Sequence, residues 1–354
     1  MNMKYKFKTV LALIVLICLC IVSTGCERQI VSEPISKTEF MMDTVITIKL
    51  YDSKNEKTLE EAFDRLRQIE NRMSKTITDS DVSKINQNAG KNPVKVHGDV
   101  YYVLKKSIEF AELTDGAYDP TIGPLVELWN IKEEGENEVH LIPEKEKIYE
   151  AMNKVDYKKL ELLDDNNVFL KEEGMILDLG GIVKGYAADE VKKILKDKGI
   201  NSAIIDLGGN IYAYGEKPKD KYWKIGIQNP FEFRGSYVGI MSVVDSSIVT
   251  SGDYERYFEV DGKRYHHIID PKTGYPAESG LSAVSVVTKN SIDGDALSTS
   301  IFILGREKGT ELIKKLGNVD AIFIDKDGKT YISPDLKDKF ELKNEKFNII
   351  NNEY

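Results

Sequence analysis

Two copies of the string Asp-Leu-Gly-Gly, at 178–181 and 206–209, are the first candidates for ligand chemistry in this chain. Paired glycines let a backbone turn sharply and approach a ligand closely. After the first copy the apolar residues take helical spacing, and Lys184 falls in the first turn. Free N–H groups at a helix start attract anions, and a lysine adds positive charge. This copy is a candidate phosphate-binding turn; a strand-to-helix corner that serves packing alone is the alternative.

A second candidate lies in the string Asp-Gly-Asp-Ala-Leu-Ser-Thr at 293–299. On a helix, Asp295 and Thr299 lie one turn apart on the same face. A carboxylate and a hydroxyl are hard oxygen ligands, which suit Mg²⁺ better than zinc. Asp293 could add a ligand or could cap the helix. On these residues alone, a cap followed by an apolar core helix remains the alternative.

Two adjacent histidines, His266 and His267, precede an Asp-Pro turn signal. Neighbouring side chains on a strand point to opposite faces, so one imidazole can face a site while the other is packed or exposed. An imidazole can act as a general base near neutral pH, although a lone histidine is more often structural. The nearby string Thr-Ser-Gly-Asp at 250–253 is expected to be a polar turn, either a ligand loop or a plain hairpin turn.

Composition excludes several classes of site. The three cysteines stand at 18, 20 and 26, so the rest of the chain has no thiolate nucleophile, no disulfide and no Cys/His zinc site. The net charge is −9 and no basic stripe is present, which argues against nucleic-acid binding. No GxGxxG fingerprint with its ribose-binding acid, Walker loop, GxSxG elbow or HExxH motif occurs.

The N-terminus has the pattern of an export signal. Lysines at 4, 6 and 8 precede an apolar stretch, Val10–Val22, which is shorter than the roughly 20 residues of a membrane span. The string Ser-Thr-Gly-Cys that follows resembles a bacterial lipobox and predicts lipidation, with palmitate among the acyl groups, at Cys26. We therefore expect a lipoprotein signal peptide at 1–25, a tether at 26–36 and one domain at 37–354. The protein would be anchored by lipid to the extracytoplasmic face of the cell membrane.

Hydrophobic periodicity predicts the elements that must position these residues. Helical spacing is seen at 59–69, 100–111, 182–195 and 293–305, and strand patterns at 40–51, 202–215, 223–260, 282–288 and 320–325. A structured loop begins at 116, and 132–138 reads as a charged loop. Strand patterns without intervening helices dominate 203–290. The prediction is an α/β (α+β-like) domain with a mixed or antiparallel sheet.

Eight stretches, in this order, resemble the ApbE-type flavin transferases, which are FAD:protein FMN transferases of the bacterial cell envelope. The resemblance covers about 40–305 and implies the ApbE-type fold rather than a Rossmann fold. It also implies that FAD is bound with Mg²⁺, and that FMN is transferred to a threonine or serine of a target protein with release of AMP. The stretches are MMDTVITI, IENRMS…DSDVSKIN, GAYDPTIGPLVELW, LDLGGIVKGYAADEV, IIDLGGNIYAYG, WKIGIQNP, TSGDYERYFEVDGKRYHHIIDPKTGYPA and DGDALSTSIFILG.

The resemblance assigns expected roles residue by residue. The metal is expected at the Gly181 carbonyl, Asp295 and Thr299, and the base is expected to be His267, with Lys184 adding positive charge. The chain departs from the family pattern at Asp43, where the family has glycine, and at Thr76, where an aromatic residue often stands. The residues expected to contact FAD are Met42, Ala117, Tyr118, Asp119, Asp178 and Lys184.

Two alternatives to the transferase stay open. The same residues would serve an FAD pyrophosphatase, in which water replaces the acceptor hydroxyl and the products are FMN and AMP. A flavin-binding lipoprotein without turnover is the other. The resemblance implies that the partners are FAD and flavoprotein subunits of membrane electron-transport complexes, or exported flavoproteins. The chain lacks the Ser/Thr-Gly-Ala-Thr/Ser string of such acceptors, so it is not expected to be an acceptor itself.

Overall fold

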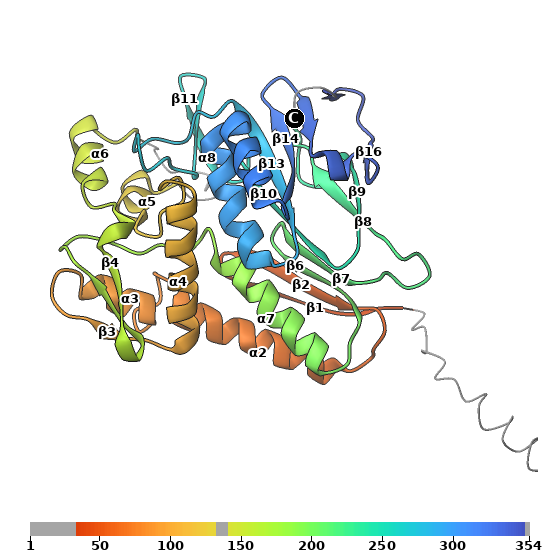
Figure 1. The fold of residues 1–354 in the computed structure, drawn as a ribbon, viewed down its shortest axis with the longest axis horizontal. Coiled ribbons are helices and arrows are strands. Elements are labelled where there is room, and N and C mark those ends of the chain that lie inside the picture. The colour runs from red at the N-terminus through yellow and green to blue at the C-terminus, as the bar shows by residue number, and fades with distance from the viewer. Residues whose placement is uncertain (1–32, 132–140, 351–354) are drawn as a thin grey trace, which may run out of the picture.

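A computed structural model describes residues 33–131 and 141–350 of the chain (Figure 1). The expected signal peptide, Cys26 and the charged loop at 132–138 lie outside these ranges. The centre of the described part is a nine-stranded sheet in which every pair is antiparallel except β15 with β17, as the sequence predicts. In sheet order its strands are β1 (Ile35–Met41), β2 (Thr44–Leu50), β6 (Ser202–Leu207), β7 (Asn210–Gly215), β10 (Ser246–Gly252), β13 (Leu281–Thr288), β14 (Asp320–Asp325), β15 (Lys329–Ile332) and β17 (Asn348–Ile349).

Both faces of this sheet are covered. Val284 and Val286 of β13 belong to the core formed with the helices, whereas Ala283 and Val287 face a second core. Because both faces are buried, β13 reads as a nearly continuous apolar run. On one face lie α2 (Glu56–Met73), α7 (Val183–Asp197) and α8 (Ser291–Leu316), and on the other a three-stranded sheet of β8 (Trp223–Gln228), β9 (Tyr237–Val243) and β16 (Phe340–Leu342) (Figure 1).

A smaller group of elements flanks the helices and carries the third core cluster. Trp129 stacks on Tyr265 with ring centroids 5.7 Å apart, and its indole N–H donates to the Gly274 carbonyl at 2.8 Å. These contacts fix the hairpin of β11 (Tyr257–Val260) and β12 (Lys263–His266) against α5 (Gly123–Trp129). The remaining elements are α3 (Asp81–Gln87), β3 (Val94–Lys95), α4 (Gly98–Leu113), α6 (Lys145–Met152), β4 (Leu160–Leu163), β5 (Asn167–Leu170) and 3₁₀ turns at Tyr157–Lys159, Asp164–Asn166 and Pro334–Leu336.

The long helices and most strands follow their predicted periodicity. The helical patterns at 59–69 and 100–111 lie within α2 and α4, and the pattern at 182–195 coincides with α7 except for Ile182, which is the N-cap. The helix expected at 293–305 extends to Leu316 through an irregular residue, Gly305, whose φ of 77° only glycine adopts readily. Among the described residues, no helix combines the length and apolar character that crossing a membrane requires.

Three boundary predictions are wrong. The pattern at 40–51 is a hairpin rather than one strand, because Met42 (φ 53°) and Asp43 (φ 56°) form a two-residue turn between β1 and β2. β1 begins at Ile35, so the last two residues of the expected tether, 35 and 36, belong to the sheet. Thr250 and Ser251, expected in a polar turn, lie within β10 because they pair with β13.

Two hairpin turns lie side by side at one end of the large sheet. The β6–β7 turn passes through Gly208 (φ 66°) and Gly209 (φ 97°), and both turns have the two positive φ angles of the tight turns favoured in hairpins. A Cβ at Gly208 would lie 1.9 Å from the Thr44 hydroxyl oxygen, so only glycine fits there. The two turns, at 42–43 and 208–209, therefore form one continuous surface, which is called the wall below.

Candidate active site

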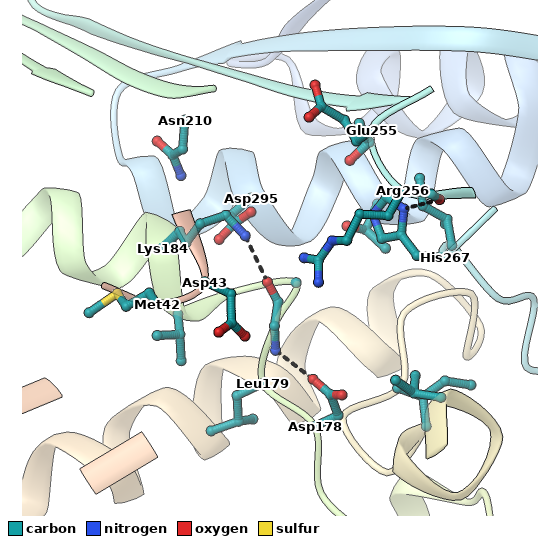
Figure 2. Close-up of a pocket in the computed structure, with 18 of the residues that line it drawn as sticks. Met42, Asp43, Asp178, Leu179, Lys184, Asn210, Glu255, Arg256, His267 and Asp295 are labelled. Atoms are coloured by element: carbon teal, nitrogen blue, oxygen red, sulfur yellow. Dashed lines mark hydrogen bonds between the residues drawn. The ribbon is translucent and has the colours of Figure 1, made fainter. Parts of the chain in front are cut away.

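One cavity of about 420 Å³ opens between this wall, the start of α7, the first turns of α8 and the segment after β12. Figure 2 shows side chains from all of these elements directed toward the same space. The ten residues singled out from the sequence in the described range all line it: Met42, Ala117, Tyr118, Asp119, Asp178, Gly181, Lys184, His267, Asp295 and Thr299.

Asp295, Thr299 and Gly181, the three residues expected to hold a metal, all line the cavity. Asp295 is only 4% exposed, and Thr299 follows it one turn along α8. A Cβ at Gly181 would lie 3.3 Å from the Thr299 hydroxyl oxygen, so the Gly181 backbone is next to that hydroxyl. Burial raises the pKa of Asp295, while nearby Lys184 lowers it. One buried carboxylate, one hydroxyl and one neighbouring carbonyl fit a hard cation such as Mg²⁺.

α8, which carries Asp295 and Thr299, and α7, which begins two residues after Gly181, cap each other. The Gly185 N–H of α7 donates to Asp295 Oδ2 at 2.8 Å. In return, the Asp189 carboxylate of α7 accepts from the N–H groups of Ser291 and Ile292 at the start of α8, both at 2.9 Å. Burial raises the pKa of Asp189 to about 6. Each helix thus satisfies donors that the other leaves open, which fixes Asp295 relative to the turn at 178–181.

Gly185→Ala tests this close helix contact. A Cβ at 185 would lie 2.3 Å from the Ser291 carbonyl oxygen and 2.7 Å from Ile292 Cα, so α7 and α8 must separate. We expect the free energy of unfolding to fall by about 1–3 kcal/mol, because the close contact between the two helices is lost. Urea unfolding measures this effect. Gly98→Ala is the control and should be neutral or stabilising, because the nearest atom to a Cβ at this helical glycine, Asn166 Nδ2, lies at an ordinary contact distance of 3.9 Å.

The turn at 178–181 is held by its own side chains. Asp178 Oδ1 accepts from the Gly180 N–H at 2.8 Å, and Oδ2 pairs with Lys75 at 3.0 Å. The Lys184 ammonium donates to the Gly180 carbonyl at 3.2 Å (Figure 2). Asp178 therefore shapes the turn, while Lys75 and Lys184 bring positive charge to its two sides.

Asp119 and Tyr118 line the cavity but use their polar atoms within the protein. Asp119 accepts from the Thr121 N–H at 2.8 Å, the Thr121 hydroxyl at 2.6 Å and the Tyr157 N–H at 3.0 Å. Burial raises the pKa of Asp119 despite these bonds. The Tyr118 hydroxyl lies 3.2 Å from Ser107 Oγ. Both side chains thus brace the loop against which a ligand would rest.

His267 faces the cavity, whereas His266 is packed away from it. The two were expected to be neighbours on one strand, but β12 ends at His266 and His267 lies in the bend that follows. His266 Nε2 lies 3.0 Å from the Ala277 carbonyl. His267 Nδ1 lies 3.3 Å from the Arg256 carbonyl, and Nδ1–H donates to that oxygen (Figure 2). This tautomer leaves Nε2 as a proton acceptor. Burial, reinforced by Arg256, lowers the pKa of His267 to about 3, so its ring is neutral at physiological pH.

A pH titration followed by histidine NMR tests this description. Burial lowers the pKa of His266 to about 4, and we expect both rings to remain neutral at pH 5.5. Because both values lie below the ordinary 6.5, the unfolded chain takes up these protons first. Their contribution to stability is therefore lost as pH falls below 6.5. Protonation of either ring near pH 6.5 in the folded protein would contradict the burial of these groups.

Several lining residues were not singled out from the sequence. Arg234 and Arg256 line the cavity with Lys75 and Lys184. These four cationic side chains stand beside six carboxylates in the lining, those of Asp43, Glu70, Asp119, Asp178, Glu255 and Asp295. Asn210, directly after the second Asp-Leu-Gly-Gly string, lines it too. The string carried the only sequence signal for Asn210. The two arginines lie outside the helices and strands of the fold, where spacing gives no indication of direction.

Comparison with known proteins agrees with this geometry. The ApbE family profile matches residues 42–323. A protein of Treponema pallidum named FAD:protein FMN transferase is 35% identical over 351 residues, covering 94% of this chain and 96% of its own length. One of the same name from Klebsiella pneumoniae is 35% identical, covering 89% and 96%.

Solved structures of the family share the fold. The ApbE protein of Thermotoga maritima superimposes with a TM-score of 0.78 at 32% identity, covering 87% of this chain and 99% of its own. The flavin transferase ApbE from Vibrio cholerae gives 0.77 at 29% identity, with the same coverage. Sequence and fold agree over most of the chain, and the protein belongs to the ApbE family.

Proposed function

We propose that this protein transfers FMN from FAD to a threonine or serine hydroxyl of a target flavoprotein, with Mg²⁺ bound and AMP released. The observation that carries the proposal is the meeting, in one cavity, of the oxygen set of Asp295, Thr299 and Gly181 with a neutral His267. Lys75, Lys184, Arg234 and Arg256 place positive charge in the cavity lining, where it can offset the phosphates of a dinucleotide. The relatives are named FAD:protein FMN transferase, and from this name we infer that the substrate is FAD and that the acceptor is a protein.

The reaction exchanges one phosphorus–oxygen bond for another. The acceptor hydroxyl oxygen attacks the FMN-side phosphorus of FAD, and the bond from that phosphorus to the oxygen of AMP breaks. His267 Nε2 takes the hydroxyl proton as the new bond forms. Lys184, at the start of α7, faces the phosphates and offsets their charge.

Asp295, Thr299 and the Gly181 carbonyl would hold the Mg²⁺. When bound, the ion neutralises charge on the pyrophosphate and favours departure of AMP. The capping of Asp295 by Gly185 keeps the carboxylate in place before the ion arrives. Tyr118 and Asp119 keep the facing loop fixed, so that the substrate meets a preformed surface.

We also propose the arrangement of the chain at the membrane. Residues 1–25 are a lipoprotein signal peptide, Cys26 carries the lipid, and a short tether leads into a single domain on the extracytoplasmic face. Flavoprotein subunits of membrane electron-transport complexes, or exported flavoproteins, are the acceptors. Labelled palmitate incorporated into the wild-type chain but not into Cys26→Ser supports this; equal labelling of both overturns it.

Product analysis tests the activity. The full chain in detergent is mixed with FAD, MgCl₂ and a peptide containing Ser-Gly-Ala-Thr, then AMP and peptide mass are measured. AMP with a peptide heavier by one FMN unit is the expected result. AMP with free FMN and unmodified peptide would instead favour the pyrophosphatase. FAD binding without AMP would leave a non-catalytic flavin-binding lipoprotein.

A further inference from the structure

Asn210 presents a buried hydrogen-bond donor, its Nδ2, that no atom in the described part of the chain accepts. The residue is 1% exposed, and its Oδ1 accepts from the Ser291 hydroxyl at 2.7 Å. Ser291 Oγ in turn accepts from the Ser247 hydroxyl at 2.8 Å. This relay orients the amide, while Asn210 Nδ2 has no partner among the described residues. A buried amide without a partner is costly, which calls for a ligand that completes it.

This donor differs in its location from the other buried polar atoms that lack a hydrogen-bond partner. Six buried side-chain atoms within 33–131 and 141–350 lack a partner, and Asn210 Nδ2 is the only one whose residue lines the cavity. Figure 2 shows the Asn210 amide nitrogen directed toward the side where Lys184 and Asp295 lie. A group that enters there meets an amide donor and an ammonium together. Phosphoryl oxygens accept hydrogen bonds and carry the negative charge that an ammonium favours.

We propose that Asn210 donates a hydrogen bond to a phosphoryl oxygen of the ligand in this cavity. The inference rests on the proposed function, because it takes the ligand to be FAD. Ser247 and Ser291 act as positioning residues that hold the Asn210 amide in one orientation. Asn210 thereby joins the β7 side of the wall to the start of α8, and the donor is set before the ligand binds.

Binding of four ligands to the full chain in detergent, with MgCl₂, tests the proposal. Asn210→Asp keeps the side-chain shape but replaces the donor with a carboxylate oxygen. We expect the affinities for FAD and FMN to fall at least tenfold, and the affinity for riboflavin, which has no phosphate, to stay within about twofold. AMP, the fourth ligand, shows whether the lost contact lies on the adenylate phosphate as well. Asn210→Ala, which adds no charge, should lose affinity in the same order.

Asn229→Asp is the matched control. Asn229 is also 1% exposed, but its Oδ1 accepts from the Phe231 N–H at 3.0 Å and it lies outside the cavity. This variant should bind FAD as the wild type does. Thermal unfolding identifies any variant that is not folded, in which case Asn210→Ala decides.

Two results would overturn the inference. One is a folded Asn210→Asp or Asn210→Ala variant that binds FAD and FMN with wild-type affinity. The other is an equal loss for riboflavin and FAD, which would place the contact away from phosphate. Wild-type protein that binds FAD but modifies no peptide would overturn the proposed transfer alone. Wild-type protein that binds no flavin would overturn both.

Discussion

Asp295→Asn is expected to lower Mg²⁺-dependent AMP release from FAD by about a thousandfold, equivalent to roughly 4 kcal/mol of activation free energy. The asparagine keeps the shape of the side chain, and its oxygen can still accept from the Gly185 N–H that now bonds Asp295 at 2.8 Å. The negative charge, however, is lost from the only carboxylate in the proposed oxygen set. The loss therefore falls on cation binding rather than on the helix contact. Initial rates over a range of MgCl₂ concentrations measure it.

Asp293→Asn is the control for this variant. Asp293 lies two residues earlier on α8 and pairs with Lys106 at 3.6 Å, but it does not line the cavity. The same chemical change there should leave AMP release within about twofold of wild type. Wild-type activity in a folded Asp295→Asn variant would rule out Asp295 as the side chain that holds the cation.

His267→Gln is expected to retain FAD binding but to lower transfer to the acceptor hydroxyl by about 10²–10⁴-fold. Glutamine can still donate toward the Arg256 carbonyl that His267 Nδ1 contacts at 3.3 Å, but its amide does not accept a proton at neutral pH. FAD fluorescence measures binding, and peptide mass under single-turnover conditions measures transfer. Unchanged FAD binding together with slow transfer is the result expected when a general base has been removed.

His97→Gln provides the comparison for the second variant. His97 precedes α4 and its Nδ1 lies 2.7 Å from Asp81, outside the cavity. Transfer by this variant should match wild type, although stability can decrease. If His267→Gln forms the flavin–peptide product at the wild-type rate, another group takes the hydroxyl proton and the proposed base is wrong.

The sequence predicted most helices and strands, and it predicted which residues line the cavity. It predicted less well what each of these residues contacts there. Apolar spacing was enough for α2 and α7, because their buried faces repeat over several turns. The turn at Met42 and Asp43 was missed, since neither residue is among the Asn-Gly pairs that usually mark such hairpins. Aspartate adopts the left-handed region more readily than most residues, which permits Asp43 where the family has glycine.

Long-range contacts account for what sequence patterns left open. The contact of Asp119 with FAD stays a prediction, while the structure shows its carboxylate accepting from the N–H of Tyr157, 38 residues away. The Asn210 amide is oriented by Ser291, 81 residues away, so no local pattern could reveal its direction. The resemblance placed ten residues in one cavity, whereas only the folded chain shows which of their atoms remain open to a ligand.

The mutual capping of α7 and α8 also has a consequence for how the protein is made. Gly185 and Asp295 are 110 residues apart, and Asp189 is 102 residues from Ser291. A chain being synthesised from its N-terminus therefore completes the turn at 178–181 long before the helix that stabilises it exists. The hydrogen bonds between α7 and α8 cannot form until about 300 residues have been synthesised. A truncated chain that ends before Ser291 contains most of the cavity wall but lacks Asp295 and Thr299, so we expect it neither to bind the proposed cation nor to act on a flavin.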